Sequence, residues 1–125
     1  MIFDTDVMIW AFRGKAKALD AIDAADVRAI SAVTYMELLQ GVRNRREMQE
    51  MKRFLGRLGF AVLPVDANIS NRAVSIMEET ALKSDLGVCD ALIFGTACEK
   101  GELLLSGNQK HFKEVPLLSA RAFRA

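Results

Sequence analysis

Four oxygen-bearing side chains interrupt the apolar stretches of this sequence and could together bind a metal ion. Asp4 follows an apolar run at the start of the chain, and Glu37 lies inside a second apolar segment. Asp90 begins another such stretch, and Asn108 follows a fourth. Ionised carboxylates are costly to bury unless their charge is compensated, and three of them in one pocket would also repel one another. The pattern therefore indicates a Mg²⁺ or Mn²⁺ site and metal-assisted hydrolysis of phosphodiester bonds.

Each of these residues also has an ordinary structural role open to it. Asp4 or Asp90 could cap the helix that follows, and Glu37 could belong to the solvated face of a helix. Asn108 follows a glycine, and this pair is common in turns. Asp6 stands immediately before helix-like apolar residues, so we expect Asp6 to be the cap and Asp4 to be free to act as a ligand.

The bulk composition fits a small globular protein. The chain has 125 residues, of which 51% are hydrophobic, so residues 1–125 are expected to form one domain. The net charge of +1 excludes a polycation, and the single histidine excludes a histidine-rich metal cage. No stretch approaches the roughly 20 apolar residues of a membrane helix. No signal peptide is evident either, so we expect a cytoplasmic protein.

Short apolar runs alternate with helical patterns along the chain. Strands are expected at residues 1–3, 27–30, 61–63, 103–105 and 115–118. Helices are expected at residues 6–12, 15–25, 31–42 and 44–58, and from residues 66 and 90 onward. This alternation predicts an α/β fold, with a mostly parallel sheet of about four or five strands covered by helices on both faces. Pro116 cannot donate to a sheet ladder, so the last strand should lie at an edge.

The expected topology would bring the polar residues together. In open α/β sheets, ligands bind at the carboxyl ends of the strands. Asp4 and Asn108 fall just beyond expected strand ends, while Glu37 and Asp90 lie in helices that could start from the same rim. We therefore expect the three acids to be neighbours, and we expect raised carboxylate pKa values when no metal is bound.

A basic cluster and three potentially reactive side chains complete the candidates. The cluster lies in and just before one expected helix and comprises Arg43, Arg45, Arg46, Lys52, Arg53 and Arg57. It could contact RNA phosphates or an acidic partner, or it could be a solvated helix face. His111 lies between two lysines and is expected in an exposed loop, whereas Cys89 and Cys98 are expected to pack in the interior.

Four segments of the chain resemble, in order and spacing, the motifs of the PIN-domain family, and in particular its VapC-type toxins. The segments are Met1–Val7, Ser31–Gly41, Asp90–Ile93 and Leu104–Asn108. The resemblance implies a Rossmann-like three-layer fold and a metal-dependent endoribonuclease, the toxin of a type II toxin–antitoxin pair. It also implies an RNA substrate, a homodimer, and a cognate antitoxin that blocks the site.

Carried over residue by residue, the resemblance implies that Asp4, Glu37 and Asp90 hold Mg²⁺ or Mn²⁺. Asn108 and Ser106 match polar positions of the fourth motif, and Asp6 could assist. Many members have a carboxylate three residues after this Asn, where the present chain has His111.

This departure from the family motif keeps a second possibility open, a weakened domain that only binds protein or RNA. A third possibility is less favoured. The Asp-x-Asp opening also matches haloacid-dehalogenase-like phosphatases, but Asp85 and Asp90 are not the adjacent acidic pair that those enzymes need.

Overall fold

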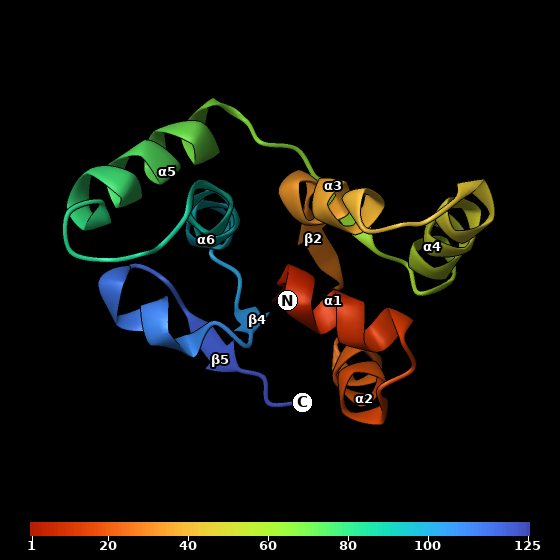
Figure 1. Cartoon of the computed structure of the whole chain (residues 1–125). Coiled ribbons are helices and arrows are strands. Elements are labelled where there is room, and N and C mark those ends of the chain that lie inside the picture. The colour runs from red at the N-terminus through yellow and green to blue at the C-terminus, as the bar shows by residue number, and fades with distance from the viewer.

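The computed structural model describes residues 1–125 as a parallel β-sheet with helices on both faces (Figure 1). The strands are β1 (Ile2–Phe3), β2 (Ala29–Ser31), β3 (Ala61–Leu63), β4 (Leu104–Ser106) and β5 (Ala120–Ala122). Their order in the sheet is β3-β2-β1-β4-β5, and every neighbouring pair is parallel. The predicted α/β sandwich is confirmed, and its sheet is parallel throughout.

Six α-helices and one 3₁₀ helix connect these strands. They are α1 (Thr5–Phe12), α2 (Ala16–Ala24), α3 (Ala32–Gln40), α4 (Arg45–Arg57), α5 (Ala67–Thr80), α6 (Val88–Lys100) and η1 (Gln109–Glu114). The side chains of Ser31, Asn44 and Asp66 accept hydrogen bonds from the first turns of α3, α4 and α5. These are N-caps, which satisfy amides that have no partner within the helix. None of the helices has the combination of length and apolarity that a membrane span requires.

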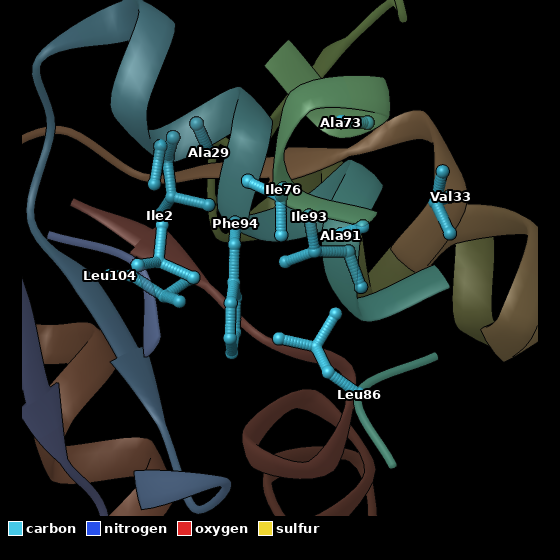
Figure 2. Close-up of a cluster of buried hydrophobic side chains, with 12 residues drawn as sticks. Ile2, Ala29, Val33, Ala73, Ile76, Leu86, Ala91, Ile93, Phe94 and Leu104 are labelled. Carbon is cyan, nitrogen blue, oxygen red and sulfur yellow. The ribbon is translucent and has the colours of Figure 1, made fainter. Parts of the chain in front are cut away.

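Alternate residues of the short strands feed two hydrophobic clusters, one on each face of the sheet. Ile2 and Leu104 face α5 and α6, where they pack with Phe94 and other residues labelled in Figure 2. Phe3 and Leu105 face the opposite side and pack with residues of α1, α2 and α4. Because both faces are covered, the central strands are apolar throughout rather than alternating with polar residues.

Helix α6 packs closely on α5, and Gly95 lies where the two helices meet. A Cβ atom added at Gly95 would lie 3.4 Å from the backbone nitrogen of Ala73 and 3.4 Å from the carbonyl oxygen of Ile69. The amino-terminal turn of α6 carries Asp90.

The strand expected at residues 115–118 is wrong. Val115 does reach the core, with 4% of its surface exposed, but Leu118 donates its amide to the Val115 carbonyl in a turn, and Leu117 is 65% exposed. The edge strand instead lies at Ala120–Ala122, where it pairs with β4. Its sequence is Ala-Arg-Ala, which has no apolar pattern that would mark it as a strand.

Candidate functional site

The candidate site lies where the order of the strands reverses. From β1 the chain builds β2 and β3 on one side, and then returns to build β4 and β5 on the other. Such switch points leave a crevice at the carboxyl ends of the two diverging strands. Asp4 immediately follows β1 and Ser106 ends β4, so both lie at this end of the sheet.

Asp4 is a buried carboxylate held by two hydrogen bonds. The Thr5 amide donates to its Oδ1 at 2.7 Å, and the Ser106 hydroxyl donates to its Oδ2 at 2.6 Å. Only 6% of the residue is exposed. Burial raises the pKa of Asp4 from 3.8 to about 6, against the lowering effect of the Ser106 hydrogen bond. The expected rise in carboxylate pKa is therefore found at Asp4, and burial is its main cause.

The expected division of roles between Asp4 and Asp6 is wrong. Helix α1 begins at Thr5, and its N-cap is Asp4. Asp6 lies in the first turn, where its Oδ1 accepts from the Val7 amide and its Oδ2 from the Gly107 amide, each at 2.8 Å. Asp6 therefore ties the start of α1 to the segment that follows β4. Burial raises its pKa as well.

Thr5 links Glu37 to Asp4, because its hydroxyl contacts Glu37 and its amide contacts Asp4. The Thr5 hydroxyl donates to Glu37 Oε1 at 2.6 Å and lies 3.1 Å from the Thr34 hydroxyl. Thr34 is fully buried, one helical turn before Glu37. The sequence-based prediction missed both threonines, although a hydroxyl residue next to Asp4 and another three residues before Glu37 were visible signals.

Asp90 lies in the first turn of α6. The helix begins at Val88, so the expected start at Asp90 is wrong by two residues. The Asp90 side chain turns back, and its Oδ2 accepts from the Gly87 amide at 3.2 Å. A carboxylate in the first turn also faces the positive end of the helix dipole.

Asp4, Asp6 and Asp90 lie close enough for their charges to interact. The charges of Asp6 and Asp90 both raise the pKa of Asp4, although less than burial does. Cys89 is exposed, and the expectation that it packs in the interior is wrong. The pKa of its thiol is raised, mainly by partial burial and then by the charges of Glu37 and Asp90. Cys89 thus lies near the two acids that come from α3 and α6.

The side-chain oxygens of the site suit a hard divalent cation, because they belong to carboxylates and hydroxyls. The acids are not gathered into a ready-made cage, since no three acidic, histidine or cysteine side chains converge closely enough. Each carboxylate is instead held by a donor of its own: Ser106 for Asp4, Thr5 for Glu37 and the Gly87 amide for Asp90.

Asn108 reaches the site through its backbone. Its amide donates to the Ser106 hydroxyl at 3.0 Å, and that hydroxyl in turn donates to Asp4. Asn108 occupies the N-cap position of η1 without a side-chain hydrogen bond to that helix. Its side-chain amide is therefore not used in capping.

His111 is not the exposed loop residue that the sequence suggested. Only 4% of it is exposed, and its ring lies between two carboxylates. The Nε2 atom is 3.1 Å from Asp85 Oδ1, and the Nδ1 atom is 3.2 Å from Glu114 Oε2. The charges flanking it in the sequence gave no sign of these partners, which come from the turn before α6 and from the end of η1.

Two members of the basic cluster are neutralised within the chain. Arg43 pairs with Glu47 at 2.9 Å and Arg46 pairs with Glu50 at 3.2 Å. The other four members make no ion pair: Arg45, Lys52, Arg53 and Arg57. A groove of about 600 Å³ runs from Glu37 along α4 and is lined by apolar side chains and by charged side chains of both signs.

Comparison with known proteins decides the family. The family model described as "PIN domain" matches residues 1–118. The chain belongs to the PIN domain family. PIN domains are generally nucleases, so membership places the chain among the hydrolases that act on nucleic acid. The family match gives no support to the phosphatase alternative.

Solved structures with the same fold agree with this assignment. A toxin–antitoxin complex from Klebsiella pneumoniae contains a chain 28% identical, with 94% of this chain and 93% of that one covered and a TM-score of 0.75. VapBC2 from Rickettsia felis, bound to a promoter DNA fragment, gives 22% identity, coverage of 99% and 100%, and a TM-score of 0.81. DNA-bound VapBC from Salmonella typhimurium gives 22% identity, coverage of 97% and 96%, and a TM-score of 0.81. No curated protein matches the chain.

The raised pKa of Asp4 predicts a pH-dependent contribution to the stability of this PIN domain. An acid whose pKa is raised by folding favours the folded state at low pH and disfavours it once ionised. The contribution of Asp4 is therefore fully present below about pH 4 and is lost as pH rises through about 6. A rise from 3.8 to about 6 corresponds to about 3 kcal/mol. Carbon-detected NMR titration of the Asp4 carboxyl should give a midpoint near 6, and a midpoint near 4 would contradict this.

Gly107→Ala is expected to disturb the site of the PIN domain without unfolding it. A Cβ atom at this position would collide with Asp6 Oδ2, so the Asp6 carboxylate would have to leave the Gly107 amide. We expect nucleic-acid cleavage to fall by roughly 10-fold, as for loss of an outer-shell contact. Gly56→Ala is the matched control, because nothing lies within 4 Å of its added Cβ in α4. The control should retain cleavage and gain about 0.5–1 kcal/mol of stability.

Proposed function

We propose that this PIN domain is a divalent-metal-dependent endoribonuclease and the toxin of a type II toxin–antitoxin pair, acting in the cytoplasm. The observation that carries the proposal is the buried carboxylate of Asp4 at the switch point, with the charges of Asp6 and Asp90 acting on it. Uncompensated negative charge of this kind is what Mg²⁺ or Mn²⁺ would relieve.

In the proposed mechanism, Asp4, Glu37 and Asp90 hold the ion. When bound, the ion would activate water and neutralise negative charge on the phosphate. Ser106 orients Asp4, and Thr5 orients Glu37, through the hydrogen bonds that each donates. Asn108 contributes a neutral oxygen donor at the edge of the site. These hydrogen bonds hold the two carboxylates in place in the absence of a metal ion.

RNA would approach along the outer face of α4. Arg45, Lys52, Arg53 and Arg57 are not paired with acidic groups of the chain, so they remain available to phosphates. The expected contribution of Arg43 and Arg46 is smaller than the sequence suggested, because Glu47 and Glu50 oppose them. Phosphate contacts of this kind weaken steeply with salt, which makes salt dependence a direct measure of them.

The cognate antitoxin would enter the groove beside Glu37. That groove is lined by apolar side chains, among them Phe12 and Met51, and by charged side chains of both signs, among them Glu37 and Arg13. A partner segment that fits it would carry apolar side chains and a basic group opposite Glu37, which makes no ion pair within the chain. We also propose a homodimer, which analytical ultracentrifugation of the purified chain would detect.

The proposed activity is tested by incubating the chain with single-stranded and structured RNA. Cleavage should require Mg²⁺ or Mn²⁺, stop on chelation, and fall by at least about 100-fold in Asp90→Asn. Equal cleavage by the wild type and the variant would indicate a contaminating nuclease.

The second candidate is a domain that only binds protein or RNA. The absence of a preassembled acidic cage favours it, and so does His111 at the position where many family members have a carboxylate. Wild-type protein that binds RNA tightly but leaves it intact at millimolar Mn²⁺ would establish this alternative.

A further inference from the structure

The ring of His111 joins two segments that are distant in the sequence. It lies in η1, which follows Asn108, and it contacts Asp85 in the turn between α5 and α6. The Ser84 hydroxyl lies 3.3 Å from the other ring nitrogen and donates to Glu114 at 2.6 Å. These four side chains form one connected group, which we call the His111 clamp: Ser84, Asp85, His111 and Glu114.

The His111 ring is the buried centre of the clamp. Its side chain is 5% exposed, whereas that of Asp85 is 76% exposed. Lys110 also reaches Asp85, at 3.2 Å, but this pair is exposed on both sides. Exposed ion pairs contribute little, so the Lys110 contact alone would not hold the turn in place.

The turn held by the clamp leads directly to Asp90. The Ser84 hydroxyl accepts from the Leu86 amide at 3.1 Å, and the next amide, that of Gly87, donates to Asp90 Oδ2. Leu86 itself is 4% exposed and packs in the cluster around Phe94 (Figure 2). Displacing residues 84–87 would therefore move the donor that orients the Asp90 carboxylate.

We propose that His111 is a positioning residue, which fixes residues 84–87 and through the Gly87 amide sets the orientation of Asp90. The role of Asp90 in binding the ion rests on the function proposed above. The clamp also ties η1, which begins after Asn108, to the amino terminus of α6. His111 thus couples two parts of the candidate site.

The chemistry of the position accounts for the residue found there. An imidazole ring presents nitrogen atoms on opposite edges, and here both face carboxylate oxygens. A carboxylate at residue 111 would instead bring a third negative charge beside Asp85 and Glu114. His111→Asp should therefore open the clamp, even though it would restore the carboxylate common in the family motif.

The test compares four variants of the full chain. His111→Asn shortens the side chain so that it no longer reaches Asp85, and His111→Gln retains an amide donor at about the position of Nε2. His111→Asp adds the opposing charge. Lys110→Ala is the matched control, because it removes only the exposed contact to Asp85. Three quantities are measured: amide hydrogen exchange by NMR, Mn²⁺ affinity by calorimetry, and RNA cleavage as kcat and KM.

The clamp predicts a local effect in His111→Asn and His111→Asp. The Leu86 and Gly87 amides should exchange about 10-fold faster, while amides in the middle of α6 keep their wild-type rates. Mn²⁺ affinity should fall by roughly 10-fold. The value of kcat should fall while the KM for RNA stays unchanged, because the turn orients a metal ligand rather than the substrate. His111→Gln should recover most of each loss, and Lys110→Ala should show none.

Two results would overturn the proposal. One is unchanged exchange at Leu86 and Gly87 in His111→Asn, or a uniform acceleration along α6, which would indicate a general loss of stability. The other is tighter Mn²⁺ binding and faster cleavage in His111→Asp. If the wild type neither binds Mn²⁺ nor cleaves RNA, the proposed function fails, while the exchange rates still decide whether His111 positions the turn.

Discussion

Asp4→Asn is expected to abolish RNA cleavage and at the same time to stabilise the unliganded protein. Asparagine keeps the size of the side chain and an oxygen that can accept from the Thr5 amide. It removes the buried carboxyl group of Asp4, whose pKa is raised to about 6 in the folded protein. Cleavage should fall by at least about 100-fold, since a metal-binding carboxylate is lost. The free energy of unfolding at pH 8 should rise by about 1–3 kcal/mol.

The two effects of this variant are measured separately. Cleavage is followed with Mg²⁺ or Mn²⁺ present, and unfolding by urea is followed with chelator at pH 4 and pH 8. The gain in stability should be absent at pH 4, where Asp4 of the wild type is protonated. Asp23→Asn, on the exposed surface of α2, is the matched control and should alter neither quantity. A variant less stable than the wild type at pH 8 would show that the ionised Asp4 carboxylate does not destabilise the folded protein.

Phe94→Ala is expected to produce the largest loss of stability among the changes considered. Phe94 is fully buried in α6, and its ring lies edge-on to that of Phe112 in η1, with 6.3 Å between the ring centroids. Truncation of a buried phenylalanine typically costs about 3–5 kcal/mol, through lost transfer free energy and the cavity left behind. Urea denaturation of the unliganded protein measures it.

The loss at Phe94 should also reach the candidate site. Phe94 lies one turn after Asp90 in α6, and its partner Phe112 follows His111 in η1. Leu82→Ala is the control, because Leu82 is fully exposed and its truncation should change stability by no more than about 0.5 kcal/mol. Similar losses in the two variants would mean that the packing between α6 and η1 adds nothing to stability.

The fold was accessible from the sequence because its central strands are apolar on both faces. Ile2 and Phe3 point to opposite clusters, and so do Leu104 and Leu105, so both strands were visible as apolar runs. Ser31 and Asp66 also marked helix starts correctly. The last strand was missed because pairing with β4, rather than any hydrophobic pattern, defines Ala120–Ala122.

The candidate site was accessible only in part. Strand ends located Asp4 and Asn108, because parallel strands end at a common rim. The hydrogen bonds of Thr5 and the burial of His111 depend on partners about 30 residues away, such as Glu37 and Asp85. No local pattern encodes such contacts. The choice between Asp4 and Asp6 as helix cap moves the helix boundary by two residues, a difference that local propensity does not resolve.

The central claim is that Asp4, Glu37 and Asp90 bind one divalent ion. The most direct measurement is anomalous diffraction from a crystal of the protein soaked in Mn²⁺. The account predicts an anomalous peak within about 2.0–2.4 Å of oxygens from these three side chains. A well-ordered soaked crystal with no peak there, or with Mn²⁺ bound only elsewhere, would contradict it.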